Sequence, residues 1–288
     1  MLQKESVLML HNYYQTPGGE DVSMQAEVEV LKSNSHNVEI LSWHNNSIND
    51  YSLIDKTNLI WKSVWNPESK ETVYGKLKES DFDILHVQNF FPLISPSVYS
   101  AARNLSIPIV QHLRNFRLGC LNGYLYRNQG VCEQCIGHNP WRGVWHQCYR
   151  NSLASSFTLW QLLTVHRFRQ TWFQDVDLFI TPSQFSANKL IEIGLPENRL
   201  KVKPNCVVDP LKDSEIPSFP QSPSFMFVGR LSKEKGILEL LKAWRLVNQP
   251  EWQLWIVGGG SQSELLKTYC QEHQLANVQF LGYRSPPE

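Results

Sequence analysis

The stretch Phe225–Gly236, which reads FMFVGRLSKEKG, indicates the class of fold. Its first four residues are apolar and typical of a buried strand, and Gly229 provides a turn. The apolar residues that follow recur at helical spacing: Ile237, Leu240, Leu241, Trp244 and Val247. A strand, a glycine turn and a helix in this order form the repeating unit of an α/β protein with a parallel sheet.

The turn in this stretch carries positive charge beside the start of a helix. Arg230, Lys233 and Lys235 follow the strand, where backbone N–H groups and the helix dipole favour an anion. Gly236 lets the backbone approach a ligand closely. A basic cluster can also be simple solvated loop charge. Because parallel sheets bind ligands just outside the carboxyl ends of their strands, we predict a phosphate site formed by Gly229, Arg230 and Lys235.

Length and composition limit the possible classes of function. The 288 residues are enough for two domains of ordinary size. Lysine plus arginine number 27, as do aspartate plus glutamate, so no overall field attracts nucleic acid. The first apolar run is interrupted by His11 and Asn12, which predicts neither a signal peptide nor a membrane-spanning helix. We therefore expect a cytoplasmic protein with reduced cysteines and no nucleic-acid partner.

The first part of the chain alternates strands with helices. Strands are expected at residues 6–10, 37–41, 82–87, 107–110 and 177–181. Gly18 and Gly19 lie between the first strand and the first helix. They lack the full G-x-G-x-x-G spacing of a dinucleotide site, so a plain tight turn explains them as well as a ligand-binding loop does.

A polar segment, QHLRNFRLGCLNG, follows the strand at residues 107–110. Arg114 and Asn115 lie in it, at the point where a parallel sheet presents its ligand site. These side chains are candidates for holding a sugar or a phosphate. The alternative is a polar loop that contains one or two salt bridges.

Four cysteines are clustered in the middle of the chain: Cys120, Cys132, Cys135 and Cys148. The central pair has C-x-x-C spacing, and four thiolates can surround a zinc ion tetrahedrally. A zinc ion would anchor a loop that is too polar to form its own core. The alternatives are a redox pair, four unligated thiols, or a histidine in place of one sulfur. We predict a structural zinc site rather than a catalytic one.

Residues 152–174 interleave apolar side chains with His166, Arg167 and Arg169. This composition suits a core helix with a solvated edge, and it also suits a helix that rests on an anionic membrane surface. Peripheral contact with the inner face of the plasma membrane is therefore an open alternative.

The chain is expected to form two domains. Residues 206–224 contain four prolines and few apolar residues, as interdomain linkers do. They separate a first domain at residues 1–205, with the cysteine-rich insertion at 120–148, from a second domain at 225–288. The second domain has three expected strands, fewer than half of a doubly wound fold normally contains, so we expect it to be partial.

The stretch VGRLSKEKG resembles the donor-binding turn of glycosyltransferase family 4, which reads V-G-R-L-x-x-x-K-G. The resemblance implies that Arg230 and Lys235 bind the diphosphate of a nucleotide sugar. They would neutralise its charge as it leaves, so no catalytic metal is required. Family members also carry a G-G-x-E/A loop that faces the donor diphosphate, which assigns Gly18 and Gly19 to the donor site.

Two departures from the family pattern affect the expected site. Where members often read T-L-H-N-Y-R-L-L-C, this sequence has Arg114 in place of the histidine. Arginine cannot act as a general base, so the resemblance assigns Arg114 and Asn115 to acceptor binding only. The sequence also lacks the acidic E-x7-E motif that holds the donor sugar, so the chain looks truncated at its C-terminus. A four-cysteine insertion similar to the one here occurs in a subset of the family.

We expect an α/β protein of the GT-B type, with two Rossmann-like domains facing a cleft and the second incomplete. The resemblance implies a retaining glycosyltransferase that uses a UDP- or GDP-linked sugar. Its acceptor would be a glycan or a lipid-linked molecule, in cell-surface polysaccharide synthesis. One alternative is a truncated, non-catalytic nucleotide-binding remnant. Another is a sugar-nucleotide epimerase, which shares the two-domain plan.

Overall fold

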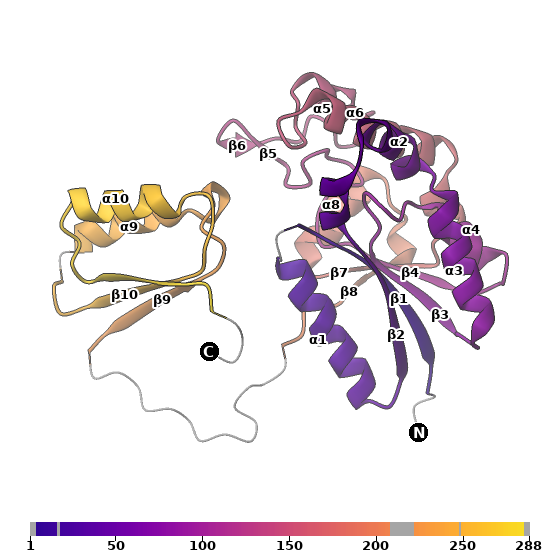
Figure 1. Ribbon diagram of the computed structural model, residues 1–288, viewed down its shortest axis with the longest axis horizontal. Helices are drawn as coiled ribbons and strands as arrows, with labels where there is room; N and C mark the ends of the chain where they lie inside the picture. The colour runs from indigo at the N-terminus through magenta and orange to yellow at the C-terminus, as the bar shows by residue number, and fades with distance from the viewer. Residues whose placement is uncertain (1–3, 16–17, 208–221, 248, 285–288) are drawn as a thin grey trace. The chain divides into compact units, whose positions relative to one another are not determined.

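We describe the protein from a computed structural model, which covers residues 4–15, 18–207, 222–247 and 249–284 (Figure 1). The chain divides into two compact units, residues 1–208 and 209–288. The linker predicted at residues 206–224 lies mostly outside the described residues.

The first unit is built on a six-stranded parallel sheet with the strand order β2-β1-β3-β4-β7-β8. Its strands are β1 (Ser6–Tyr13), β2 (Asn37–His44), β3 (Ile84–Asn89), β4 (Ile109–His112), β7 (Leu178–Thr181) and β8 (Leu200–Val202). The strand order reverses between β1 and β3. In sheets of this kind, ligands bind at the carboxyl ends of the strands beside that reversal.

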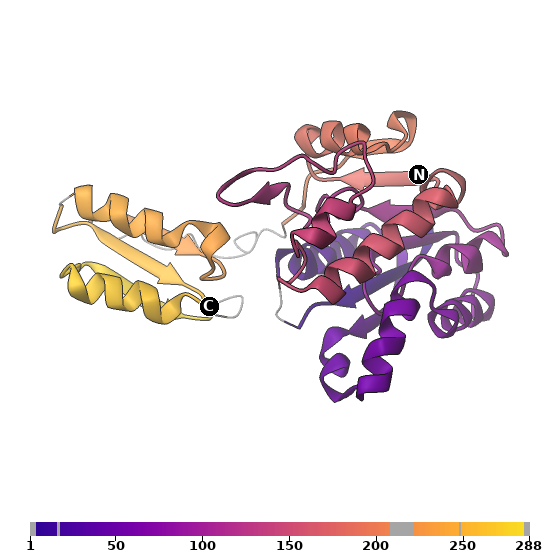
Figure 2. The same ribbon diagram turned by 90° about the horizontal axis from the view of Figure 1, so that it is seen from above.

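Helices cover both faces of this sheet (Figures 1 and 2). They are α1 (Gly19–Ser33), η1 (Asn45–Asp50), α2 (Leu53–Val64), α3 (Pro67–Glu79), α4 (Ser97–Arg103), α6 (Leu153–Phe168), α7 (Thr171–Gln174), α8 (Gln184–Ile193) and η2 (Glu197–Arg199). Ser52 caps α2 and Asn66 caps α3, which divides a region without clear periodicity into two helices. No helix in the described part of the chain is long and apolar enough to cross a membrane.

The hydrophobic core has one part on each face of the sheet. Val7 and Met9 of β1 pack with Met24 of α1, whereas Leu8 and Leu10 point into the larger core on the other face. Because both faces are covered, β1 reads as a continuous apolar run rather than as an alternation. The face under α1 is the one that carries the polar cluster described below.

The cysteine-rich insertion contains β5 (Tyr126–Arg127), β6 (Gly130–Val131) and α5 (Trp141–Trp145). It lies at the same end of the first unit as α2 and α6 (Figure 1). Leu121 anchors it in the main core, and a Cβ atom on Gly143 would lie only 2.7 Å from Leu121 Cδ1. Val144 and Tyr149 also pack against that core. The insertion is therefore held by apolar contacts.

The second unit has a three-stranded parallel sheet in the order β11-β10-β9. Its elements are β9 (Ser224–Val228), η3 (Lys233–Lys235), α9 (Ile237–Val247), β10 (Gln253–Val257), α10 (Ser263–Glu272) and β11 (Val278–Gly282). Both helices lie on one face of the sheet (Figures 1 and 2), where Leu241 and Trp244 of α9 meet Ile256. On the opposite face, Met226 and Val228 are exposed.

Candidate functional site

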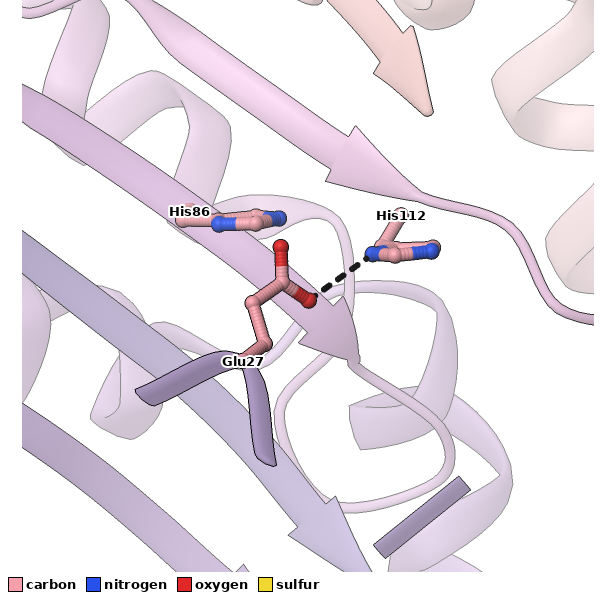
Figure 3. A group of neighbouring side chains, drawn as sticks. All are labelled: Glu27, His86 and His112. Carbon is pink, nitrogen blue, oxygen red and sulfur yellow. Dashed lines mark ion pairs between the residues drawn. The ribbon is translucent and has the colours of Figure 1, made fainter. Parts of the chain in front are cut away.

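A buried polar cluster lies where α1 crosses the sheet of the first unit. Glu27 of α1 points toward His86 of β3 and His112 of β4 (Figure 3). The two imidazole rings are parallel, with centroids 6.0 Å apart and an interplanar angle of 1°. Nδ1 of His112 lies 3.3 Å from Glu27 Oε2. All three residues are buried, so their interactions are screened little by water.

Two cations also contact the Glu27 carboxylate. Nη2 of Arg114 lies 3.1 Å from Oε2, and Nζ of Lys203 lies 3.3 Å from Oε1. The Gln88 amide donates a 3.1 Å hydrogen bond to Glu27 and accepts one from Arg114. Arg114, whose side chain is 7% exposed, is therefore held by its neighbours rather than free to move toward a ligand.

Burial decides the protonation states in this cluster. It lowers the pKa of His86 to about 4 and also lowers that of His112, despite the opposing effect of Glu27. Burial tends to raise the pKa of Glu27, but His112, His86 and Lys203 outweigh it and hold that pKa well below its usual range. Near neutral pH the cluster therefore contains neutral imidazoles and one carboxylate that faces the cations of Arg114 and Lys203.

A second polar network fixes Asn115. Its amide donates a 2.8 Å hydrogen bond to Oε1 of Glu20, at the start of α1. The Tyr14 hydroxyl donates to the other Glu20 oxygen at 2.8 Å, and it accepts a 3.2 Å hydrogen bond from Arg117. The Arg117 guanidinium lies 5.6 Å from the centre of the Tyr149 ring, which holds it by a cation–π contact.

The two networks share the wall of a pocket at the carboxyl ends of β3 and β4. The pocket has a volume of about 40 Å³, enough for a few water molecules. Its polar lining includes Glu20, Gln88, Asn89, Gln111, His112, Arg114, Asn115 and Arg117. The predicted acceptor residues Arg114 and Asn115 are thus neighbours on one wall, each tied to a carboxylate of α1.

Gly18 and Gly19 lie at the N-terminus of α1. The Gly18 N–H donates to Asp21 Oδ2 at 2.8 Å, and Oδ1 of the same carboxylate lies 2.7 Å from His11 Nε2. A Cβ atom at either glycine would meet no described atom within 4 Å. Close packing is therefore not the reason for glycine at these two positions. Open space beside a helix N-terminus is consistent with the predicted ligand-binding loop.

The predicted donor residues of the second unit lie on an exposed turn. Nη2 of Arg230 lies 3.4 Å from Oε1 of Glu234, and the Arg230 side chain is 43% exposed. Glu234 is itself held by a 2.7 Å hydrogen bond from Ser232. Lys235 is exposed at the end of η3, directly before Gly236, which has φ 67° and leads into α9. Both cations are accessible beside the start of a helix.

A second glycine turn packs tightly against this donor turn. A Cβ atom on Gly258 would lie 1.9 Å from the Gly229 carbonyl oxygen, and one on Gly260 would lie 2.3 Å from that of Leu231. The Leu231 N–H donates to the Gly259 carbonyl at 2.9 Å. Glycine is required at 258 and 260 because one backbone turn rests on the other.

The structure does not support the predicted zinc site. Among the described residues, which include Cys120, Cys132, Cys135 and Cys148, the three-residue group with ligand atoms within 4.8 Å of one another is Glu27, His86 and His112. The thiols are still near neighbours: burial, with a contribution from Cys120, raises the pKa of Cys148 to about 11. Apolar contacts with the main core also anchor the insertion, and the four-cysteine zinc site stays a prediction.

The residues at the centre of the first cluster were not identified as site residues from the sequence. They are Glu27, His86, Gln88 and Lys203. One signal was visible: the triplet H-V-Q lies in β3, and the triplet H-L-R begins at the last residue of β4, each with two polar side chains spaced by two residues. Because alternate residues of a strand share a face, His86 and Gln88 had to point the same way, and an extended continuation of β4 would do the same for His112 and Arg114. Glu27 and Lys203 carry no comparable local signal.

Comparison with protein families identifies two matching domains. The domain described as Glycosyltransferase Family 4 matches residues 17–209, and the one described as Glycosyl transferases group 1 matches residues 210–288. The first match alone covers more than half of the chain, which therefore belongs to glycosyltransferase family 4. The predicted recognition and enzyme class are confirmed: the protein is a retaining glycosyltransferase that uses a nucleotide sugar.

Solved structures confirm the predicted GT-B fold. Anabaena HepE in complex with UDP and glucose aligns with a TM-score of 0.55 at 16% identity, over 98% of this chain and 70% of that chain. WaaG, a glycosyltransferase involved in lipopolysaccharide biosynthesis, aligns with a TM-score of 0.55 at 14% identity, over 97% and 70%. The second domain here is partial relative to these chains. Curated protein sequences gave no significant match.

Proposed function

We propose that the protein transfers a sugar from a UDP- or GDP-linked donor to a glycan or a lipid-linked acceptor in cell-surface polysaccharide synthesis. The observation that carries this proposal is the exposed pair Arg230 and Lys235 beside the start of α9. The solved HepE structures contain UDP-glucose, or UDP with glucose, which supports a donor of the same class.

The donor turn has the chemistry that a departing diphosphate requires. As the bond between sugar and phosphate breaks, negative charge grows on the diphosphate oxygens. Arg230, Lys235 and the free N–H groups of α9 would neutralise that charge without a metal ion. We also assign the N-terminus of α1, at Gly18 and Gly19, to nucleotide-sugar binding, because the space beside both glycines is open and a helix N-terminus favours an anion.

The acceptor is proposed to bind at the wall formed by Arg114 and Asn115. Glu27 and Gln88 orient the Arg114 guanidinium, and Glu20 orients the Asn115 amide, so both groups are positioned before an acceptor arrives. Neutral His112 lines the same pocket and adds a polar ring to its wall. A lipid-linked acceptor would also bring the enzyme to a membrane surface.

Titration of UDP and GDP into the full chain tests the donor site. Arg230→Ala and Lys235→Ala should each weaken nucleotide affinity about ten-fold or more, because a hydrogen bond to a charged group contributes about 1.5–3 kcal/mol. Lys242→Ala, an exposed cation farther along α9, is the matched control and should bind like the wild type. Equal affinity in all four proteins would exclude this donor site.

Product analysis with a labelled nucleotide sugar separates transfer from the two alternatives. Transfer releases free nucleoside diphosphate, and the label moves to the acceptor. A labelled product that still carries its nucleotide would instead indicate an epimerase. Nucleotide binding without release of diphosphate would indicate a binding remnant.

A further inference from the structure

A second pocket lies in the first unit, between β2, α2 and α3. Its volume is about 250 Å³, whereas the pocket beside Arg114 has a volume of about 40 Å³. Pockets that bind small molecules typically have volumes of about 300–1,000 Å³, so this one suits a ligand about the size of a single sugar ring. We call it the α2–α3 pocket, and its lining includes Trp43, Tyr51, Lys62, Asn66, Glu68 and Leu93.

The charges in the α2–α3 pocket cancel. Nζ of Lys62 lies 2.6 Å from Oε1 of Glu68, and the other lining side chains are aromatic, aliphatic, amide or hydroxyl groups. A diphosphate or an anionic headgroup would therefore meet one carboxylate for its one cation. Because binding requires complementary charge, the lining favours a ligand that is polar and uncharged.

The lining groups match the chemistry of a sugar. The C–H groups on one face of a sugar ring carry slight positive charge, and aromatic rings such as those of Trp43 and Tyr51 have a negative face. Sugar hydroxyls both donate and accept hydrogen bonds, so one can accept from the Lys62 ammonium while another donates to the Glu68 carboxylate. The Tyr51 hydroxyl and the Trp43 indole N–H have no hydrogen-bond partner among the described residues, so both can also bind a ligand.

Hydrogen bonds hold the walls of the α2–α3 pocket in place. The Leu93 N–H donates to Asn12 Oδ1 at 3.1 Å, and the Asn66 amide donates to the Leu93 carbonyl at 2.6 Å. Tyr51 ends η1 and directly precedes Ser52, which caps α2. A pocket whose walls are fixed before binding loses little conformational entropy when a ligand enters.

One loop joins this pocket to the proposed acceptor wall. Asn89 and Phe91 line the pocket beside Arg114, and Leu93 lines the α2–α3 pocket. The Asn89 amide donates a 2.7 Å hydrogen bond to the backbone carbonyl of Asn12, whose side chain accepts from Leu93. Two residues span at most about 7 Å of extended chain, so the two pockets lie within the length of a short glycan.

We propose that the α2–α3 pocket binds an uncharged sugar residue of the acceptor, separate from the residue that receives the donor sugar. This inference rests on the proposed transfer to a glycan acceptor and assigns that acceptor a second contact. The wall at Arg114 and Asn115 positions the reacting end, and the α2–α3 pocket selects acceptors that carry a further sugar residue. Binding there lowers the KM for such an acceptor and leaves donor binding unchanged.

Saturation-transfer NMR of the full chain with neutral sugars tests the proposal. The probes are the methyl α- and β-glycosides of glucose, galactose, mannose and N-acetylglucosamine. We expect at least one to bind, with an affinity that is the same at about 0.05 M and 0.5 M salt, because an uncharged ligand is not screened. Lys62→Gln should weaken this binding about ten-fold, because it removes a charged donor, and Tyr51→Ala should weaken it as much. No binding by any of the probes would overturn the proposal.

Matched variants test whether the sugar binds in this pocket. Lys56→Gln on α2 and Glu71→Gln on α3 change exposed charges that do not line the pocket, and both should bind sugar like the wild type. Lys62 and Glu68 form a solvent-accessible pair, so Lys62→Gln should unfold like the wild type. Trp43 also packs against the main core, which makes Tyr51 the better aromatic residue to change. If Lys56→Gln weakened sugar binding as much as Lys62→Gln, the proposed pocket would be wrong.

Comparison with a donor-site variant separates this proposal from the proposed function. Arg230→Ala should lose UDP affinity and keep sugar binding, whereas Tyr51→Ala should lose sugar binding and keep UDP affinity. Loss of sugar binding in Arg230→Ala would assign the sugar to the donor site and overturn the proposed pocket. Sugar binding at the pocket without any transfer would refute the proposed transfer and leave the sugar site standing.

Discussion

Arg114 and Arg230 occupy equivalent places in their two sheets but have opposite surroundings. Each lies two residues beyond a parallel strand, after β4 in one case and β9 in the other. Arg114 is buried and bonded to Glu27 and Gln88. Arg230 is exposed and has one long contact, to Glu234. The same residue type at the same position after a strand is thus a buried, immobilised side chain in one unit and an accessible cation in the other.

This difference follows from what covers each strand end. In the first unit, α1 brings a carboxylate over the ends of β3 and β4, so the nearby arginine is drawn into a buried ion pair. Burying an ion pair costs desolvation free energy, which the attraction between the charges offsets only when their geometry is good. The main effect of this pair is therefore to hold the two side chains in place rather than to stabilise the fold. In the second unit, Arg230 stays in solvent, where a phosphate can displace its weak partner.

Of the substitutions considered, Glu27→Gln should lower the stability of the fold the most. This change leaves the buried Arg114 guanidinium without a counter-charge, and removing one partner of a buried ion pair typically costs about 3–5 kcal/mol of stability. Urea unfolding measures the loss. Glu29→Gln, an exposed position on the same helix, should change stability by less than about 0.5 kcal/mol. Equal unfolding of both variants would show that Arg114 does not depend on Glu27.

Acid should destabilise the first unit by a comparable amount. The pKa of His86 is about 4 in the folded chain, against an ordinary value of 6.5, because burial disfavours the imidazolium. Between these values the unfolded chain binds a proton that the folded chain does not. Stability is therefore fully present above pH 6.5 and falls toward pH 4, by about 3 kcal/mol.

Burial lowers the pKa of His166 to about 4 as well, so protonation of His166 should lower the stability of the fold by a similar amount over the same pH range. Urea unfolding at pH 7 and pH 4.5 measures the sum. The variant His86→Gln should lose its share of the pH dependence and keep that of His166. An unchanged pH profile in this variant would contradict the role given to burial.

The sequence predicted the elements of this fold better than the contacts between them. Strand and helix periodicity located most of the two sheets, and the V-G-R-L turn located Arg230. The pairing of Arg114 with Glu27 joins residues 87 positions apart and depends on how α1 crosses the sheet, which no local pattern encodes. The zinc site stays a prediction for a related reason: cysteine spacing does not show whether apolar packing alone holds a loop.

Disturbing the packing between the two glycine turns should lower stability by an intermediate amount. In Gly260→Ala, the new Cβ would meet the Leu231 carbonyl oxygen at 2.3 Å, so two backbone turns must separate. Overpacking of this kind costs about 1–3 kcal/mol, and here it would also displace the donor turn and weaken UDP binding. Gly259→Ala is a matched control, because a Cβ atom there meets no described atom within 4 Å. Thermal unfolding and UDP titration of both variants measure the difference.

Glu234→Gln should change stability the least. It tests most directly whether the Arg230 guanidinium is free to bind a ligand. Glu234 is a partly exposed carboxylate 3.4 Å from Arg230, and exposed ion pairs contribute about 0–1 kcal/mol, so stability should change little. A bound diphosphate would compete with this carboxylate for the guanidinium and be repelled by its charge. Removing the charge should therefore raise UDP affinity about two- to five-fold, most clearly at low salt. A decrease in affinity would mean that Glu234 positions Arg230 for the phosphate, which would make the exposed arginine resemble its buried counterpart.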